Sequence, residues 1–339
     1  MGEIKKVLKL LLRGLGWLFY AGMTLWCFGA AWYSNLPWHW LRVTCAVVVV
    51  GLLICGVLLR KRKGLWGAAG IMAAVAVWFM LIPATNDRPW LPSFARNPYA
   101  VFSPDGSEVT IHDIRDFDYR AEHDFTVRYI TGTCKLDELR SMDYIQVHWD
   151  GMEAIAHSML SFGFADGRHL TVSVETRLAE GDVQGALPGL YKCFGLLMIL
   201  GTERDLLGLR TNYRHEQVYL YPTGCNREQV RTVFLDILRR VNELREEPQF
   251  YNTIRHNCFT SLIPSLKLIM PQMRRDISML FNGLTDKRIY EYELAKGKFH
   301  DGSYQDFRQL HYVNPKVDRL PELPTANEYS GLIRRPPGK

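Results

Sequence analysis

Three long apolar runs dominate the first quarter of the chain, at residues 14–33, 43–59 and 64–83. Each is about long enough to cross, as a helix, the roughly 30 Å hydrocarbon core of a bilayer. A cleaved signal peptide is a poor alternative, because its apolar region is shorter and further spans do not follow it. The pattern therefore predicts a three-span anchor over residues 1–84.

Basic residues lie beside these runs in an uneven way. Four precede the first run, and Arg60-Lys61-Arg62-Lys63 separates the second run from the third, whereas the loop at residues 34–40 has none. Lys and Arg accumulate in short cytoplasmic loops. We therefore expect the N-terminus in the cytoplasm and the chain from residue 85 onward outside the cytoplasm.

The formal net charge of +6 comes from the basic residues beside these apolar runs. Residues 1–84 hold nine of the 41 Lys and Arg residues and one of the 35 acidic residues, so they carry +8 and the remainder carries −2. A basic nucleic-acid-binding domain is thereby excluded. A hydrophobic content of 47% also excludes a disordered chain.

After a linker at residues 85–107, short stretches rich in strand-forming residues alternate with turns. They predict strands at residues 108–112, 125–131, 144–149, 154–164, 169–176 and 217–221. Asp166-Gly167 predicts a hairpin turn. Residues 187–200 are apolar throughout, which is typical of either a helix or a buried strand.

Helical periodicity is clearest at residues 226–244, where Asn226 and Gln229 match a capping box. A second helix is expected to begin near Cys258 and to end before Pro271. The fold class predicted is α+β, with helices packed on a mostly antiparallel sheet. Residues 108–312 form this domain, and the Pro-rich tail at 313–339 is expected to be extended.

Four cysteines lie outside the apolar runs, at Cys134, Cys193, Cys225 and Cys258. The absence of any C-x-x-C pair excludes zinc ribbons and thioredoxin-like motifs, and no metal or cofactor is expected. Asn257 is a favoured cap residue, which places Cys258 in the first turn of a helix, where the dipole stabilises a thiolate and N–H groups can hold an oxyanion. The alternatives are a buried structural thiol and one half of a disulfide.

A nucleophilic thiol needs a base and a group that orients the base. His157 is a candidate base on an apolar strand, where the simpler interpretation is a core histidine. For the orienting group, Glu175 is the stronger chemical candidate. Thr176 is the better geometric one, because a two-residue turn places it opposite His157. A bulge would reverse that parity.

Two clusters of charged residues remain. Arg115 and Asp116 belong to the first, and the second contains Arg204, Arg210, Asn212 and Arg214. Structural ion pairs are the default explanation. Arginines that hold a phosphate or a lipid headgroup are the alternative.

Several strings occur together in one order, at residues 109–120, 154–164, 173–177, 203–205, 209–214 and 251–253 with Asn257-Cys258. Together they resemble the Lnb N-terminal periplasmic domain family, over roughly residues 92–271. The resemblance implies a permuted papain-like domain in which Cys258 is the nucleophile and His157 its base. It also implies an anchor in a bacterial inner (cytoplasmic) membrane. The name-giving Lnb enzymes are lipoprotein transacylases, which move an acyl chain from the diacylglyceryl group of one lipoprotein to the N-terminal amine of another.

The function expected is therefore thiol-dependent acyl transfer, from a membrane lipid or lipoprotein ester through a Cys258 thioester to an amine. One alternative is a cysteine peptidase or amidase that acts on cell-wall peptides in a polar cleft. The other is a non-enzymatic membrane scaffold or sensor. A distance between Cys258 and His157 far beyond hydrogen-bond reach, or a disulfide at Cys258, would favour the scaffold.

Overall fold

The computed structural model describes residues 2–59, 62–149, 151–271, 273, 282–295, 302–318, 320 and 322–336. By its internal contacts the chain divides into two units. One comprises Met1–Thr85 together with Asp182–Phe194, and the other comprises Asn86–Gly181 and Gly195–Lys339.

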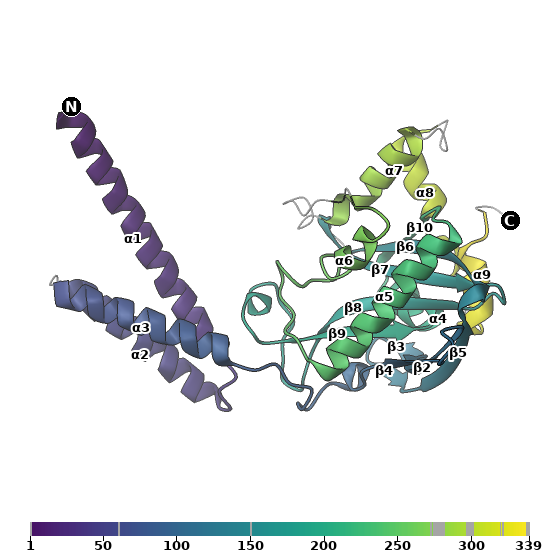
Figure 1. Ribbon diagram of the computed structural model, residues 1–339, viewed down its shortest axis with the longest axis horizontal. Coiled ribbons are helices and arrows are strands. Elements are labelled where there is room, and N and C mark those ends of the chain that lie inside the picture. Colours follow the sequence, from purple (N-terminus) through teal and green to yellow (C-terminus); the bar gives the residue numbers. More distant parts are fainter. Residues whose placement is uncertain are drawn as a thin grey trace. The chain divides into compact units, whose positions relative to one another are not determined.

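The first unit contains α1 (Gly2–Trp32), α2 (His39–Leu58) and α3 (Arg62–Leu81), shown in Figure 1. All three are long and apolar enough to cross a membrane, which confirms the three predicted apolar helices. α1 begins well before residue 14, because the Lys and Leu residues that precede the apolar run are themselves good helix formers. A Cβ atom at Gly56 of α2 would lie 3.0 Å from the Cβ atom of Ala68 in α3, so these helices approach each other at small residues.

The segment Asp182–Phe194 packs within this unit. The ring of Tyr191 stacks on Tyr33, and Lys192 Nζ donates hydrogen bonds to Met80 O and Ile82 O at the end of α3. The apolar stretch expected as one element at residues 187–200 is therefore divided. Its first half belongs to the helical unit, and only its second half forms a strand.

The second unit is built on an eight-stranded sheet. Its strands are β1 (Tyr99–Phe102), β2 (Glu108–Arg115), β5 (Tyr129–Lys135), β6 (Leu139–Trp149), β7 (Met152–Phe164), β8 (His169–Arg177), β9 (Gly195–Gly201) and β10 (Gln217–Pro222). The order is β1-β2-β9-β8-β7-β6-β10, with β5 paired to β2. The pairs are antiparallel except for β2 with β9. This confirms the predicted α+β class.

The other elements of this unit are short apart from one helix. They are a hairpin of β3 (Asp118–Ala121) and β4 (Asp124–Thr126), and the helices or turns η1 (Pro92–Phe94), η2 (Leu136–Glu138), α4 (Glu203–Leu206), η4 (Leu209–Tyr213), α5 (Arg227–Glu246), α6 (Ile263–Lys267), η6 (Asn282–Leu284), α7 (Thr285–Ala295), α8 (Tyr304–His311), η7 (Asn314–Lys316) and α9 (Ala326–Ile333). α5 starts with the predicted capping box, since Asn226 and Gln229 exchange side-chain-to-backbone hydrogen bonds.

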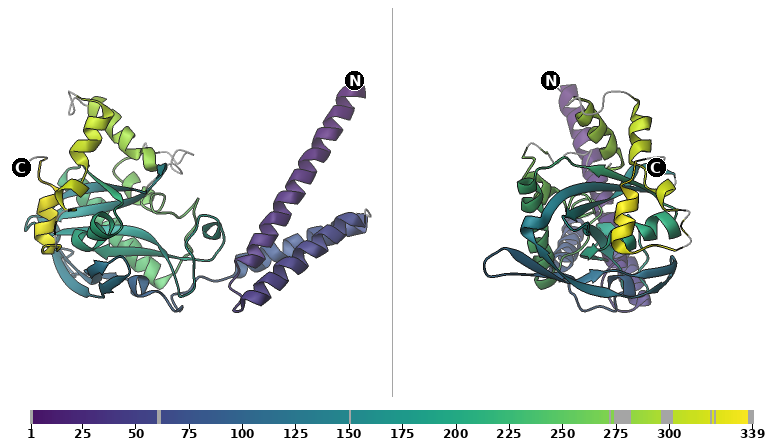
Figure 2. Two further views of the ribbon diagram at one scale, coloured as in Figure 1. Left: turned by 180° about the vertical axis from the view of Figure 1, so that it is seen from behind. Right: turned by 90° about the vertical axis from the view of Figure 1, so that its right-hand side faces the viewer.

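Both faces of the sheet are covered, because side chains on β7 alternate between two cores. Leu160 and Phe162 pack against the apolar stripe of α5 on one face. Met159 packs on the other face in a core that includes Tyr329 of α9. The right-hand view of Figure 2 shows α5 and α9 on opposite sides of the sheet.

Two of the expected irregular segments contain regular structure. In the segment expected as a linker, β1 pairs with β2 and buries Ala100. In the segment expected as an extended tail, α9 buries Tyr329 and Ile333, which are one helical turn apart. Isolated apolar residues between prolines give little periodicity, and the tertiary contacts that these residues make stabilise the helix and the strand instead.

Candidate active site

β7 and β8 separate where the candidate residues lie. The two strands pair only as far as Met159 and Ser173. Beyond this point the backbone of β7 bonds to other partners. The Ser158 N–H donates to the sulfur of Cys258, and the Cys258 thiol lies 3.7 Å from Ala156 O. The loop that carries Cys258 thus occupies the gap that β8 leaves.

Cys258 and His157 meet in this gap. The thiol and the imidazole form a hydrogen bond. His157 is buried, Cys258 is half-buried, and Cys258 is a free thiol rather than part of a disulfide. A nucleophile and a base are therefore in contact, as a thiol mechanism requires.

Glu175 lies on the far side of the imidazole ring. His157 Nε2 is 3.3 Å from Glu175 Oε1 and 2.7 Å from Ser173 Oγ. The Ser173 hydroxyl and Arg210 Nη2 both donate to Glu175 Oε1, at 2.6 and 2.9 Å. Because Nε2 faces this group, Nδ1 is the ring nitrogen left for the thiol. Arg210 comes from η4, a π-helical turn of the kind that often occurs at functional sites.

The expectation that Thr176 faces His157 is wrong, because the hairpin contains one more loop residue than a two-residue turn. Its closing hydrogen bonds run from Phe164 N–H to Arg168 O and from Gly167 N–H to Phe164 O. Gly167 has φ +83°, the left-handed conformation of a bulged turn. The extra residue reverses the parity of the register, so Glu175 shares a face with His157. Thr176 instead forms a hydrogen bond with Tyr251.

The three groups shift one another's ionisation. Burial opposes the protonation of His157, but the Glu175 carboxylate and the hydrogen bonds of Cys258 and Glu175 outweigh it and raise the His157 pKa to about 9. Burial would raise the Cys258 pKa, yet the hydrogen bond and charge of His157 lower it. Burial likewise opposes ionisation of Glu175, and His157 and Arg210 bring its pKa well below its usual range. The arrangement favours the charged forms of both groups, the imidazolium of His157 and the thiolate of Cys258, relative to an isolated pair.

We expect Glu175→Gln to move the His157 pKa from about 9 toward the acid side, since burial and the charge of Arg210 then oppose protonation with no carboxylate to offset them. When an ester acylates a thiolate, a neighbouring imidazolium can protonate the leaving group. We therefore expect the alkaline limb of the rate of Cys258 acylation by an activated ester to lie near pH 9 in the wild type and at lower pH in the variant. An unmoved limb would contradict the assignment. Glu180→Gln, at an exposed site, is the charge-matched control.

Cys258 does not begin a long helix, contrary to the sequence prediction. Residues 258–262 form a turn, and α6 covers only Ile263–Lys267. Pro264 lacks an N–H group, so the hydrogen-bond ladder cannot run through it from the turn. The hydrogen bond and charge of His157, together with the Ser158 N–H, are therefore what lower the Cys258 pKa.

Asn257 has the predicted capping role. Its Oδ1 accepts hydrogen bonds from the N–H groups of Phe259 and Thr260, and its Nδ2 donates to Thr253 O. The side chain thus shapes the turn that presents Cys258.

Asn282 also reaches the thiol, and sequence reasoning missed it. This residue of η6 is buried, and its Nδ2 lies 3.8 Å from Cys258 Sγ. The only sequence signal at this position is Asn282-Gly283, a dipeptide typical of turns. Nothing in that signal indicates a contact with β7.

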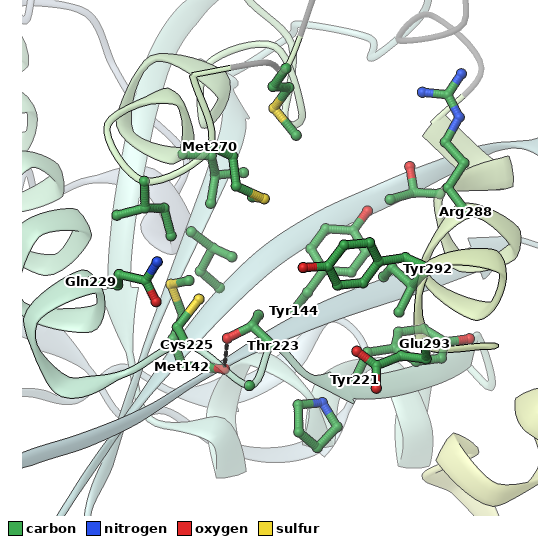
Figure 3. A pocket seen from close by; sticks show the side chains of 18 of the residues that line it. Met142, Tyr144, Tyr221, Thr223, Cys225, Gln229, Met270, Arg288, Tyr292 and Glu293 are labelled. Carbon is green, nitrogen blue, oxygen red and sulfur yellow. Dashed lines mark hydrogen bonds between the residues drawn. The ribbon is translucent and has the colours of Figure 1, made fainter. Parts of the chain in front are cut away.

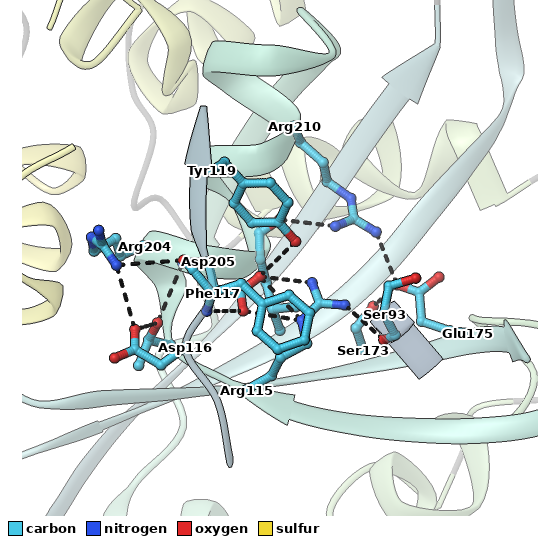
Figure 4. A network of polar contacts seen from close by, with 12 residues as sticks. Ser93, Arg115, Asp116, Phe117, Tyr119, Ser173, Glu175, Arg204, Asp205 and Arg210 are labelled. Atoms are coloured by element: carbon cyan, nitrogen blue, oxygen red, sulfur yellow. Dashed lines mark hydrogen bonds and ion pairs between the residues drawn. The ribbon is translucent and has the colours of Figure 1, made fainter. Parts of the chain in front are cut away.

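The two charged clusters come together as one network beside Glu175, drawn in Figure 4. Asp205 accepts hydrogen bonds from the Arg115 guanidinium at 2.7–3.1 Å, from Phe117 N–H at 2.7 Å and from Tyr119 Oη at 3.2 Å. Both members of the Arg115–Asp205 pair are buried. This core holds the loop that carries Arg210.

The remaining cluster residues have partners within the domain. Arg204 pairs with Asp116 and Asp118, Arg214 pairs with Glu122, and Asn212 donates to Val317 O. These contacts support the structural interpretation of the clusters over a headgroup site.

The domain also contains a cavity of about 660 Å³, shown in Figure 3, on the side of the sheet that carries Leu160. Its lining is largely apolar and includes Met142, Leu160, Leu266, Ile269, Met270 and Ile289. Two further lining residues are close, in sequence or by a hydrogen bond, to residues around the thiol. Phe259 follows Cys258 in the chain, and the Tyr144 hydroxyl is 2.8 Å from Ser158 Oγ.

Comparison with known proteins agrees with the motifs. The sequence model of the Lnb N-terminal periplasmic domain matches residues 125–291, a range that contains His157, Glu175 and Cys258. The match begins later and ends later than the resemblance in the motifs, and it includes Asn282. No curated protein and no solved structure matches the chain. Together with the three apolar helices, the match identifies a membrane-anchored protein whose residues 125–291 belong to the Lnb N-terminal periplasmic domain family.

Proposed function

We propose that the protein is a thiol acyltransferase that moves an acyl chain from a membrane lipid or lipoprotein ester to an amine through a thioester at Cys258. The proposal rests on one observation, the contact of Cys258, His157 and Glu175 in the gap between β7 and β8. The domain would be a permuted papain-like one, since the histidine precedes the cysteine in the chain.

In the first step the Cys258 thiolate attacks the ester carbonyl carbon. The C–O bond of the ester breaks, and the leaving alkoxide takes the proton of the His157 imidazolium to depart as an alcohol. In the second step an amine attacks the thioester. The C–S bond breaks, the thiolate is regenerated, and neutral His157 takes the proton that the amine loses. Ester and amine become amide and alcohol, with no change in the protein.

Glu175 orients the imidazole during both steps. It accepts hydrogen bonds from Ser173 and Arg210, which hold its carboxylate against Nε2. This arrangement directs Nδ1 at the sulfur and stabilises the positive charge of the ring.

The cavity is suited to an acyl chain. Its lining combines polar residues such as Gln229, Arg288 and Glu293 with a larger apolar surface, and its methionines are flexible enough to fit an aliphatic chain. The hydrogen bond between Cys258 and His157 also counts against a purely structural scaffold.

The anchor supports the same substrate class. Three apolar helices tether the domain to a membrane, where lipid and lipoprotein esters are concentrated. By the distribution of Lys and Arg we place the N-terminus in the cytoplasm and the domain on the other side of the bacterial inner membrane.

Intact mass spectrometry of the full chain, purified from membranes, tests the proposal. We expect a fraction of the wild type to carry a fatty-acyl mass that hydroxylamine removes, and Cys258→Ser to lack that hydroxylamine-sensitive mass. Cys225→Ser, which alters a cavity thiol, should keep the adduct on Cys258. An adduct that persists in Cys258→Ser and remains sensitive to hydroxylamine would contradict the assignment. If purified wild type is unmodified, incubation with lipoprotein and detection of an amide product decides the question.

A further inference from the structure

We propose that the side-chain amide of Asn282 is a donor of the oxyanion hole, which stabilises the negative oxygen formed when Cys258 attacks a carbonyl. This inference rests on the proposed function and adds a catalytic group that the sequence did not indicate. It follows from three features of the Asn282 environment. Both ends of the side-chain amide are held, one amide hydrogen has only long hydrogen bonds, and the neighbouring backbone approaches β7 closely.

The Asn282 side chain is clasped by one residue of β7. Ala156 N–H donates to Asn282 Oδ1 at 3.0 Å, and Asn282 Nδ2 donates to Ala156 O at 2.5 Å. The amide therefore takes the place that a strand backbone would occupy along this edge. Because both ends of the amide are held, its orientation toward Cys258 does not depend on a bound substrate.

One hydrogen of the amide remains weakly used. Nδ2 carries two hydrogens, and Ala156 O accepts the first. The second has Ser158 Oγ at 3.2 Å and Cys258 Sγ at 3.8 Å as its neighbours. Ser158 Oγ already has a stronger partner in the Tyr144 hydroxyl at 2.8 Å. The second hydrogen is thus available to a better acceptor near the sulfur.

The distance to Cys258 suits an oxyanion. In a tetrahedral intermediate the negative oxygen lies two bonds from Sγ. A donor 3.8 Å from Sγ therefore comes within hydrogen-bond reach of an oxygen on its own side, where donors act at about 2.7–3.1 Å. Burial of Asn282 excludes water from this contact and strengthens it.

The backbone at Gly283 allows Asn282 to lie this close to Cys258 and β7. A Cβ atom at Gly283 would overlap Glu153 O and lie 2.6 Å from the carbonyl carbon of Ala154, so only glycine permits this approach to β7. Gln146 Nε2 donates to Gly283 O at 2.7 Å and holds the turn from the side of β6. Gly283 and Gln146 are positioning residues.

Two reactions of the same thiol separate this role from a structural one. Alkylation by iodoacetamide forms no oxyanion, whereas acylation by p-nitrophenyl butyrate does and releases p-nitrophenol. For the full chain in detergent we expect Asn282→Ala to lower the acylation rate by about 10²–10³-fold and to leave the alkylation rate within about twofold, because the thiolate itself depends mainly on His157. Asn282→Ser, whose shorter side chain cannot reach Sγ, should show the same loss of acylation rate and the same unchanged alkylation rate as Asn282→Ala.

Asn242→Ala is the matched control. Asn242 clasps the N–H and C=O of Ala100 in the same way, at 2.8 Å each, on the edge strand β1. Its loss removes an equivalent clasp and should leave both rates unchanged. Equal loss of acylation and alkylation in Asn282→Ala, or no loss in either, would overturn the proposal. A wild-type thiol that is alkylated but never acylated by the ester would overturn the proposed function as well, and it is recognised before any variant is compared.

Discussion

His157→Gln should lower the rate of Cys258 acylation by about 10²–10⁴-fold, the usual contribution of a general acid–base group. The substitution removes the proton acceptor of the thiol and the proton donor to the leaving group in one change. It also removes the hydrogen bond and charge of His157 that lower the Cys258 pKa. Burial and the charge of Glu175 should then outweigh the remaining Ser158 N–H and raise that pKa above the usual thiol value. The acylation burst with p-nitrophenyl butyrate measures the rate.

A second measurement separates loss of the base from loss of the fold. The rate of iodoacetamide alkylation against pH reports the thiolate, and its midpoint should shift to higher pH in His157→Gln while the plateau at high pH is retained. His123→Gln, in the exposed turn between β3 and β4, is the control and should change neither quantity. An acylation rate within tenfold of wild type would show that another group acts as the base.

Asp205→Asn should lower the free energy of unfolding of the unit built on the eight-stranded sheet by about 3–5 kcal/mol, the usual cost of breaking a buried ion pair. The exposed fractions of the Arg115 and Asp205 side chains are 5% and 0%, so the guanidinium would remain buried without its counter-charge. The loss of acceptors for Phe117 N–H and Tyr119 Oη adds to this cost. Urea titration of the full chain in detergent, followed by pulse proteolysis, measures the change.

An exposed ion pair provides the control for this prediction. Arg120 and Asp124 form an i, i+4 pair with side chains 59% and 60% exposed. Asp124→Asn should therefore cost at most about 1 kcal/mol. The double substitution Arg115→Met with Asp205→Leu should recover part of the loss, since it removes both buried charges. Equal effects of Asp205→Asn and Asp124→Asn would contradict the role of burial.

The sequence pattern was sufficient to predict an element where neighbouring residues alone decide its type and its start. The apolar runs predicted three helices, and Asn226 with Gln229 predicted the start of α5, because length, periodicity and capping depend on neighbouring residues. The alternation at β7 and β8 likewise predicted two paired strands. Pro264, a helix breaker by its lack of an N–H group, explains why α6 is shorter than the helix predicted from the apolar spacing after Cys258.

The sequence pattern was insufficient to predict which side chains meet where a single loop residue sets the strand register, or where segments distant in the chain pack together. One extra residue in the hairpin at Gly167 exchanged Thr176 for Glu175 beside His157. The contact of Asn282 with β7 joins segments more than a hundred residues apart, and no periodicity encodes it. α9 depends in the same way on burial of its apolar residues against the sheet.

The sequence by itself therefore determined the anchor, the α+β class, the family and the identity of Cys258 and His157 as candidates, because these follow from composition, short-range periodicity and motif strings. Tertiary structure alone decided that the two residues meet, that Glu175 lies beside His157, and that Asn282 lies beside the thiol. The physical reason is that a reactive site is a set of distances of a few ångströms between side chains from different strands and loops. Those distances are set by strand register and side-chain packing. Both depend on which residues lie opposite each other, and no single stretch of sequence specifies that.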